Sequence, residues 1–382
     1  DSRRTATWTR HYAPTPLMRR IVATLLLAAA LLALAPVASA LARTDRKKAI
    51  WGPVTRNGVS QAPIYRDLGA KIFEMGLAWA SVAPNPPADP TNPNDPAYQW
   101  PADVDAAVAM AQQTGMRVAL SLSTAPSWAN GGHTTEWAPT DPATFAAFAQ
   151  AAARRYPSVH LWQIWPEASR AEIFMPLVPE RRSRPLTAAM KQAPHTYAAI
   201  LDDSYGALKG VSAQNLVIGG GTFTTGDISA LNWLKNLRLA NGQPPRMDLY
   251  GHNPFTARMP DLGNPPLGNG FADFSDLKIL ARWVDRYLGR AGRNRKLKLF
   301  LAEFSAPTDH ANYEFNFHVT RAVQAKWATA AYRIADHWSR IYALGWFSLY
   351  DDPPRPDGLQ VNRGLITDSG QRKPSYYAYR NG

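Results

Sequence analysis

Two hydrophobic patterns alternate along most of this chain. Short, almost wholly apolar runs are typical of buried parallel strands. After each run, a polar loop leads to a segment with apolar residues at i, i+3, i+4 and i+7, the period of an amphipathic helix. In the segment 102–114, for example, Val104, Ala107, Val108 and Ala111 share one face. The apolar runs predicted as strands are 49–54, 71–79, 116–123, 159–165, 215–218, 247–251, 298–302 and 343–349.

Eight strands that alternate with helices predict an α/β fold, a (β/α)₈ TIM barrel in a single domain. A doubly wound sheet is the alternative, but no G-x-G-x-x-G motif follows the first strand. Gly219-Gly220-Gly221 is a bare glycine run, which favours a tight strand exit over a phosphate-binding loop. The segments predicted as helices lie near 64–68, 102–114, 145–156, 197–209, 228–240, 277–288, 323–338 and 375–380.

The N-terminal region has the pattern of a secretory signal peptide. Residues 18–20 are a basic start, 21–34 are apolar, and small residues near 38–42 offer cleavage sites. We therefore predict a secreted, extracellular protein whose signal peptide is 18–42. Residues 1–17 are read as an over-extended leader, and 43–382 as the catalytic domain. An uncleaved anchor is the alternative, although the apolar run is shorter than a membrane span and no later segment could span.

Charge and composition exclude several function classes. The formal net charge is +13, and removal of residues 1–42 leaves +9. No aromatic residues interleave with the basic runs, so a solvated basic face is predicted and nucleic acid is not. The chain has no Cys, which excludes thiolate metal sites and thiol catalysis. No His, Asp or Glu cluster has metal-ligand spacing, so we expect no metal site.

Two glutamates stand at predicted strand ends. The chain has only seven Glu; Glu167 follows the fourth strand after a break at Pro166, and Glu303 ends the seventh. The C-terminal ends of barrel strands converge on one mouth, and a buried carboxylate there is costly unless it is paired or used. For Glu167 the alternative is a loop carboxylate that caps a backbone or pairs with Arg170. Two carboxylates across a barrel mouth are what glycosidic bond cleavage requires.

The sequences around these glutamates resemble those of retaining (β/α)₈ glycoside hydrolases of the cellulase and β-xylosidase kind. The segment Trp162-Gln163-Ile164-Trp165-Pro166-Glu167 is similar to that group's Trp-x-x-Trp-Asn-Glu, and Ala302-Glu303-Phe304 to its nucleophile motif. The resemblance covers nearly all of the mature chain. It implies that Glu167 is the acid/base, that Glu303 is the nucleophile and that no cofactor is needed.

The same resemblance implies substrate contacts. Trp346 ends the eighth strand, where the group keeps a sugar-stacking Trp. Further substrate-binding candidates are Trp128, Trp79, Trp165 and Asn253. For Trp346, Trp128 and Trp79 the alternative is a core or mouth-packing role. His252 is expected to bind substrate and to hydrogen-bond Glu303 rather than a metal.

Two departures from the group's pattern affect the predicted activity. Pro166 replaces an Asn that hydrogen-bonds the sugar 2-hydroxyl, and Phe255 replaces a Tyr beside the nucleophile. Loss of that amide weakens a contact that strengthens in the transition state, unless Gln163, Asn253 or His252 replaces it. We predict a secreted, monomeric glycoside hydrolase that cleaves an oligosaccharide or polysaccharide by double displacement. The alternatives are a substrate that is unusual at C2 and a catalytically weak or inactive carbohydrate-binding barrel.

Overall fold

The computed structural model describes residues 47–181, 185–289 and 296–382. These residues belong to one compact unit that spans 46–382. The predicted leader and signal peptide lie outside the described residues. Within the described ranges, no helix is both long enough and apolar enough to cross a membrane.

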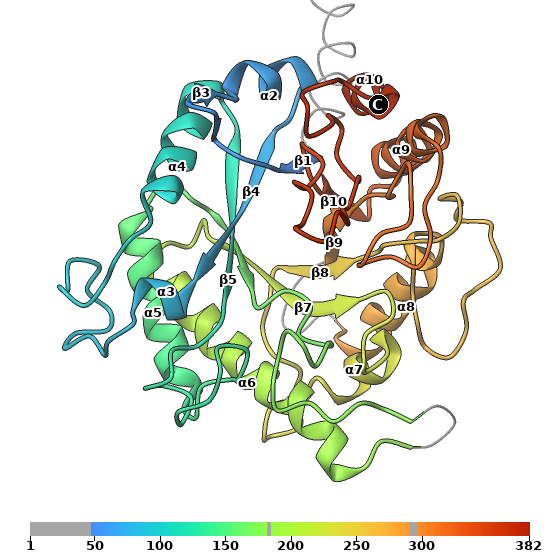
Figure 1. Ribbon diagram of the computed structural model, residues 1–382. Coiled ribbons are helices and arrows are strands. Elements are labelled where there is room, and N and C mark those ends of the chain that lie inside the picture. The colour runs from blue at the N-terminus through green and yellow to red at the C-terminus, as the bar shows by residue number, and fades with distance from the viewer. Residues whose placement is uncertain (1–46, 182–184, 290–295) are drawn as a thin grey trace, which may run out of the picture. The chain divides into compact units, whose positions relative to one another are not determined.

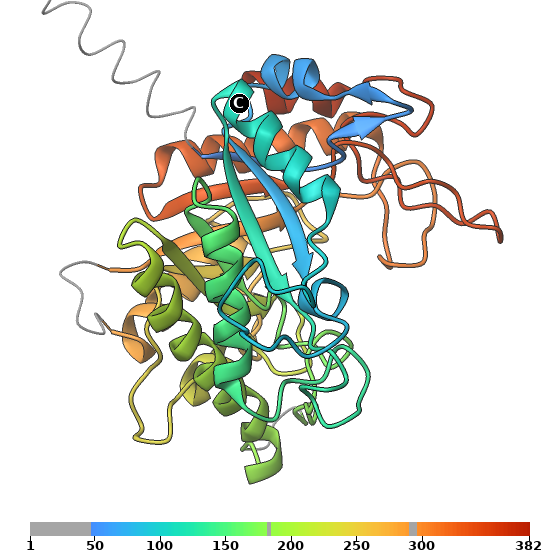
Figure 2. The same ribbon diagram turned by 90° about the vertical axis from the view of Figure 1, so that its left-hand side faces the viewer.

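The described chain folds around a closed barrel of parallel strands (Figure 1). Each strand pairs with its sequence neighbours, and β1 closes the ring against β10. Figure 2 shows β4 and β5 running side by side in one direction, as their register requires. The predicted (β/α)₈ barrel is therefore confirmed. Its strands are β1 (Lys48–Trp51), β4 (Ile72–Ala78), β5 (Arg117–Ser123), β6 (Leu161–Ile164), β7 (Leu216–Phe223), β8 (Leu249–Asn253), β9 (Lys298–Phe304) and β10 (Ile341–Trp346), and a separate hairpin is formed by β2 (Thr55–Arg56) and β3 (Val59–Ser60).

Helices surround the ring of strands and bury their apolar faces against it (Figure 1). Asp141 caps the helix that begins at Pro142 by accepting a hydrogen bond from the Ala143 backbone, so the predicted start signal is confirmed. The helices are α2 (Ala62–Leu68), α3 (Trp79–Val82), α4 (Ala102–Thr114), α5 (Pro142–Arg155), α6 (Ala188–Val211), α7 (Ala230–Asn236), η1 (Phe274–Asp276), α8 (Leu277–Tyr287), α9 (Arg321–His337) and α10 (Pro374–Asn381).

A buried apolar cluster fills part of the barrel interior, with a contribution from every barrel strand. Small residues stand beside the large ring of Phe300, which is how a closed barrel interior is packed without voids. Side chains nearer the C-terminal ends of the strands are therefore the ones that can reach an open mouth. The members are Ala49, Ile72, Ala119, Leu161, Ile218, Leu249, Phe300, Ala302 and Ala343.

The fifth barrel strand differs from its prediction. β7 continues to Phe223, so the strand exit predicted at Gly219-Gly220-Gly221 is wrong. Gly220 has φ +104° and Gly221 has φ +59°, and the pairing with β8 shifts register there. A Cβ at Gly220 would lie 2.8 Å from the carbonyl oxygen of Gly251. The glycines therefore form a bulge within the strand.

Candidate active site

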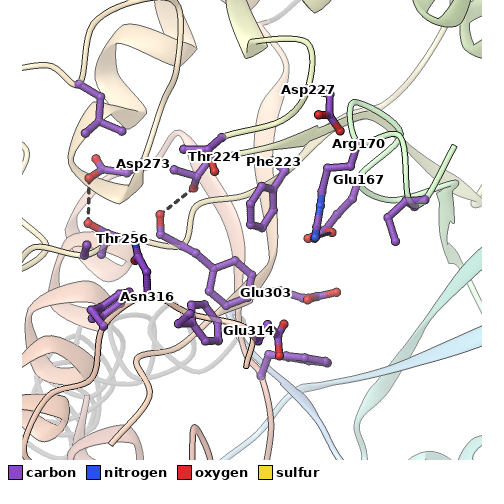
Figure 3. A pocket seen from close by; sticks show the side chains of 18 of the residues that line it. Glu167, Arg170, Phe223, Thr224, Asp227, Thr256, Asp273, Glu303, Glu314 and Asn316 are labelled. Carbon is purple, nitrogen blue, oxygen red and sulfur yellow. Dashed lines mark hydrogen bonds and ion pairs between the residues drawn. The ribbon is translucent and has the colours of Figure 1, made fainter. Parts of the chain in front are cut away.

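The structure brings Glu167 and Glu303 to one cavity of about 1190 Å³. Glu167 lies three residues beyond the end of β6, and Glu303 is the residue before Phe304, which ends strand β9. Figure 3 shows both carboxyl groups turned toward the same open space. Both strands run toward the same end of a parallel barrel, which explains why the two side chains meet there.

The backbone that presents Glu167 is strained. Trp165 has φ 41° and Glu167 has φ 55°, on either side of Pro166. A left-handed conformation is rare for a bulky residue such as Trp and persists only where its surroundings enforce it. The buried Trp165 indole does so here: its Nε1 donates to the Ile173 carbonyl at 2.9 Å, and its ring packs edge-on against Phe174. Trp165 therefore positions Glu167 from the core.

Both carboxylate oxygens of Glu167 are held by neighbours. Asn253, at the end of β8, donates its Nδ2–H to Oε1 at 2.8 Å. Arg170 forms an ion pair with Oε2 and a second ion pair with Glu172. The guanidinium of Arg170 also lies over the ring of Phe223, 4.5 Å from its centroid. The predicted pairing of Glu167 with Arg170 is thus present, and it occurs inside the cavity.

Glu303 lies close enough to Glu167 for an electrostatic interaction between the two carboxyl groups. Burial first, and then the negative charge of Glu167, raise the pKa of Glu303 well above that of an ordinary carboxyl. Arg363 and Arg170 oppose this rise through their positive charges. Glu303 therefore retains its proton to a higher pH than an exposed glutamate. The interaction between the two carboxyl groups is felt because both lie in the same cavity, where little water screens their charges.

A third carboxyl, which the sequence analysis did not select, lies close to the pair. Glu74 is in β4, is 1% exposed, and has no hydrogen-bond partner for either carboxyl oxygen among the described residues. Burial, and then the charge of Glu303, raise its pKa well above the ordinary value. Gly345 leaves room for it, because a Cβ there would overlap Glu74 Oε1. A single Glu inside an otherwise apolar strand was the signal that could have found it.

We expect Glu74→Gln to flatten the pH dependence of stability. Because the folded-state pKa is raised, the free energy of unfolding decreases as pH rises from about 4.3, the ordinary Glu value, toward the folded pKa. The loss is about 1.4 kcal/mol per pH unit within that window. The neutral amide removes this loss, so the variant gains stability relative to the parent as pH increases. Urea unfolding of the parent and the variant at a series of pH values measures this difference in the free energy of unfolding.

The matched control is Glu136→Gln, which alters a carboxyl that lies outside the cavity and whose pKa is lowered, mainly by its hydrogen bond with Thr134. It should keep the parent's pH dependence above pH of about 5. Parallel curves for the parent and Glu74→Gln would show that Glu74 is not a buried titrating group.

Two further arginines reach the cavity from loops. Arg363 forms ion pairs with Asp352 (2.9 Å) and Glu314, and its guanidinium lies 4.4 Å from the Phe347 centroid. Arg258 forms an ion pair with Asp273 at 2.6 Å. Asp273 also accepts a hydrogen bond from the Thr256 hydroxyl at 2.8 Å (Figure 3). The residues that line the cavity are Glu167, Arg170, Ala171, Glu172, Ile173, Phe223, Thr224, Thr225, Asp227, Phe255, Thr256, Ala257, Arg258, Leu267, Asp273, Glu303, Glu314, Phe315, Asn316, Phe317, Phe347 and Arg363.

The tryptophans predicted to contact substrate are placed differently from the expectation. Trp346, Trp79 and Trp165 are fully buried, Trp128 is partly buried, and none of the four is among the lining residues above. The Trp346 indole donates to the Arg363 carbonyl at 3.2 Å, and Trp128 packs edge-on against Trp79. The core-packing alternative fits these positions. Phenylalanines, which the sequence analysis did not select, supply the aromatic surface of the cavity.

The predicted hydrogen bond between His252 and Glu303 is wrong. His252 is 1% exposed, and its ring nitrogens are occupied by the Thr222 hydroxyl and the Ala272 carbonyl, each at 2.9 Å. Burial lowers the pKa of His252 to about 4, so the ring is neutral. A neutral ring donates from Nε2 to the carbonyl and accepts from the hydroxyl at Nδ1. Asn253, by contrast, does contact a site residue, through its bond with Glu167.

No cluster of three or more His, Asp or Glu side chains in the described part of the chain is arranged to hold a metal ion.

Comparison with known proteins finds solved structures of similar fold but no match among protein families or curated proteins. A family 39 glycoside hydrolase from the gut symbiont Bacteroides cellulosilyticus WH2 has a TM-score of 0.63 at 17% identity, over 89% of this chain and 64% of that one. A glucosidase from Croceicoccus marinus has a TM-score of 0.61 at 13% identity (88% and 65%). A monomeric β-xylosidase from Caulobacter crescentus CB15 has a TM-score of 0.56 at 17% identity (87% and 67%).

What these proteins share with this chain is the barrel. The resemblance to (β/α)₈ glycoside hydrolases is therefore confirmed as a resemblance of fold. The chain spans about two thirds of the length of these three enzymes, with shares of 64%, 65% and 67%.

Proposed function

We propose that this protein is a retaining glycoside hydrolase. The observation that carries the proposal is the placement of Glu167 and Glu303, from β6 and β9, in one cavity where their charges interact. Two coupled carboxyls at a barrel mouth are the requirement for cleavage of a glycosidic bond. The solved structures of similar fold, named as a glycoside hydrolase, a glucosidase and a β-xylosidase, support the same chemistry.

Burial and the charge of Glu167 favour a proton on Glu303 in the unliganded site, so the proposed reaction begins with transfer of that proton to Glu167. Glu303, now a carboxylate, then attacks the anomeric carbon while Glu167 gives its proton to the glycosidic oxygen. The bond from the anomeric carbon to that oxygen breaks, the leaving group departs as an alcohol, and a glycosyl ester of Glu303 forms. Glu167, now a carboxylate, then takes a proton from water as the water attacks the anomeric carbon, and the bond from that carbon to the Glu303 oxygen breaks to release the Glu303 carboxylate. The sugar is released with its original configuration, and both glutamates return to their starting states.

The neighbours of Glu167 have defined parts in this scheme. Asn253 and Arg170 hold one carboxyl oxygen each, which restricts the side chain to one orientation. Asn253 is the nearest substitute for the amide that Pro166 removes, because its side-chain amide reaches Glu167 from the end of β8, with only β7 between β8 and β6. We further propose that the protein is exported by the leader at 18–42 and acts as a monomer on a carbohydrate outside the cell.

The test is Glu167→Ala assayed with azide. Loss of a general acid/base typically lowers the rate by about 10²–10⁴-fold, and the loss is greatest for poor leaving groups. Azide needs no general base, so it should intercept the ester of Glu303 and restore turnover, yielding a glycosyl azide with the configuration of the substrate. Proton NMR of the product measures this configuration.

The matched control is Glu172→Ala, which removes the other carboxylate bound to Arg170. It should lose far less activity and produce no azide adduct. A glycosyl azide of inverted configuration from Glu167→Ala would assign the acid and nucleophile roles the other way round.

A carbohydrate-binding barrel without catalysis is the second candidate. The observation that favours it is the state of Glu167, which is tied to both Arg170 and Asn253, next to Pro166 where an amide is expected. Calorimetry with β-linked oligosaccharides distinguishes the two. Binding that is accompanied by no turnover of glycosyl fluorides or aryl glycosides would favour this candidate.

A further inference from the structure

Four phenylalanines form a continuous surface on the cavity. The ring centroids of Phe223 and Phe255 are 5.7 Å apart, those of Phe255 and Phe315 are 5.5 Å apart, and those of Phe315 and Phe317 are 5.9 Å apart. All four residues line the cavity that contains the two glutamates. We call this set, Phe223, Phe255, Phe315 and Phe317, the phenylalanine wall.

The phenylalanine wall is supported from behind. Thr224 donates a hydrogen bond to the carbonyl of Phe255 at 2.7 Å, which fixes the backbone that carries this ring. Phe317 packs against Trp327 of α9, with 6.2 Å between the centroids. Phe223, Phe315 and Phe317 are only partly buried, so they present ring surface to the cavity. The wall is therefore an apolar surface that is already formed in the unliganded protein.

The wall begins on the side of the proposed proton donor. Phe223 lies beneath the guanidinium of Arg170, and Arg170 is paired with Glu167. Figure 3 shows Phe223 beside Glu167 and Arg170, with Glu303 entering the same space. An acid that protonates the glycosidic oxygen must lie next to the leaving group. The wall therefore begins beside the position of the leaving group.

We propose that the phenylalanine wall binds an aromatic aglycone, so that the substrates are aryl glycosides. This rests on the proposed function and replaces the oligosaccharide or polysaccharide substrate predicted from the sequence. A second sugar would stack the C–H face of its ring on one flat aromatic face and hydrogen-bond its hydroxyl groups at the edge. Successive rings of the wall are tilted and give no common flat face, and a phenyl ring offers no donor or acceptor for those hydroxyl groups. Burial of an aromatic ring against the wall leaves no polar group without a hydrogen-bond partner. Aromatic rings also prefer the offset and edge contacts that tilted rings provide. The interplanar angles along the wall are 44° and 53° around Phe255.

The experiment compares two leaving groups on the same sugar. The probes are the 4-nitrophenyl β-glycosides and the β-glycosyl fluorides of glucose and xylose. Fluoride is too small to touch the wall, so its release reports the sugar site and Glu303 alone. Phe315→Ala removes the middle of the wall from a loop, where truncation leaves the barrel intact. Comparison of each variant with the parent on the same substrate cancels the intrinsic reactivity of the leaving group.

We expect Phe315→Ala to lower kcat/KM for the aryl glycoside by about tenfold, as loss of an aromatic anchor does, and to change the fluoride within about twofold. The matched control is Tyr313→Ala on the same loop, which is outside the cavity lining, 46% exposed, and in contact with Arg355. It should change neither rate. Phe315→Tyr, which retains the ring, should restore the aryl rate.

Three other results would overturn the inference, each for a different reason. Equal losses on the fluoride and the aryl glycoside would assign the wall to the sugar site, and the proposed function would stand. An octyl β-glycoside that is hydrolysed as efficiently as the aryl glycoside, with the same loss in Phe315→Ala, would assign an alkyl chain to the wall. A parent protein that turns over neither probe would overturn the proposed function and this inference together.

Discussion

Glu303→Gln should lower kcat/KM by roughly 10⁴-fold or more on every glycoside that the parent protein hydrolyses, because the residue is the proposed nucleophile. The amide has nearly the shape of the carboxyl but cannot form a glycosyl ester. The side chain stands at a cavity surface where its burial, and not an ion pair, dominates its energetics, so the fold should survive the change. Steady-state kinetics with a fluorogenic glycoside measure the loss.

We expect Glu303 also to set the acidic limb of the pH dependence of kcat/KM. Glu303 must be ionised to attack, and its pKa is raised by burial and by Glu167. The parent kcat/KM should therefore fall as pH decreases, beginning above the pKa of an ordinary carboxyl. Glu136→Gln serves as the control and should keep the parent rate. A Glu303→Gln variant with a substantial fraction of parent activity would exclude Glu303 as the nucleophile.

The fold was predictable because barrel strands are buried on both faces. Runs such as 116–123 and 159–165 contain few polar residues, and such runs have few alternatives to a central parallel strand. The glycines at 219–221 were misread because a bulge and a strand exit both require the same conformational freedom. Only the pairing with β8 distinguishes the two.

The meeting of Glu167 and Glu303 in one cavity was predictable, and the surroundings of these two side chains were not. Glu167 and Glu303 both follow or end a barrel strand in the sequence, and the C-terminal ends of parallel barrel strands meet at one mouth, so their side chains were expected to meet there. Whether Trp165 faces the cavity or the core depends on its left-handed backbone, which hydrophobic periodicity does not report. Arg363 and Phe315 come from loops, and loops carry no periodic signal that fixes the direction of a side chain.

The loops that complete the cavity depend on a buried ion pair between Lys373 and Asp351. The Lys373 ammonium lies 2.6 Å from Asp351 and donates to Thr308 Oγ1 and to the Asn362 carbonyl, each at 3.0 Å. Asp351 also accepts from the backbone N–H of Gly364 at 2.8 Å. Burial lowers the pKa of Lys373 and raises that of Asp351, as expected of charges removed from water. These bonds join the segments that carry Phe315 and Arg363.

Lys373→Met should therefore lower the free energy of unfolding by about 3–5 kcal/mol, because it leaves the charge of Asp351 buried without a counter-ion. Guanidinium-induced unfolding, followed by tryptophan fluorescence, measures this loss. The matched control adds Asp351→Asn, whose amide oxygen still accepts from Gly364 but carries no charge. Most of the lost stability should return in the double variant, since replacement of both partners removes the unpaired charge. If the double variant were as unstable as Lys373→Met alone, the loss would come from packing around the lysine stem, and the ion pair would not be what holds the two loops together.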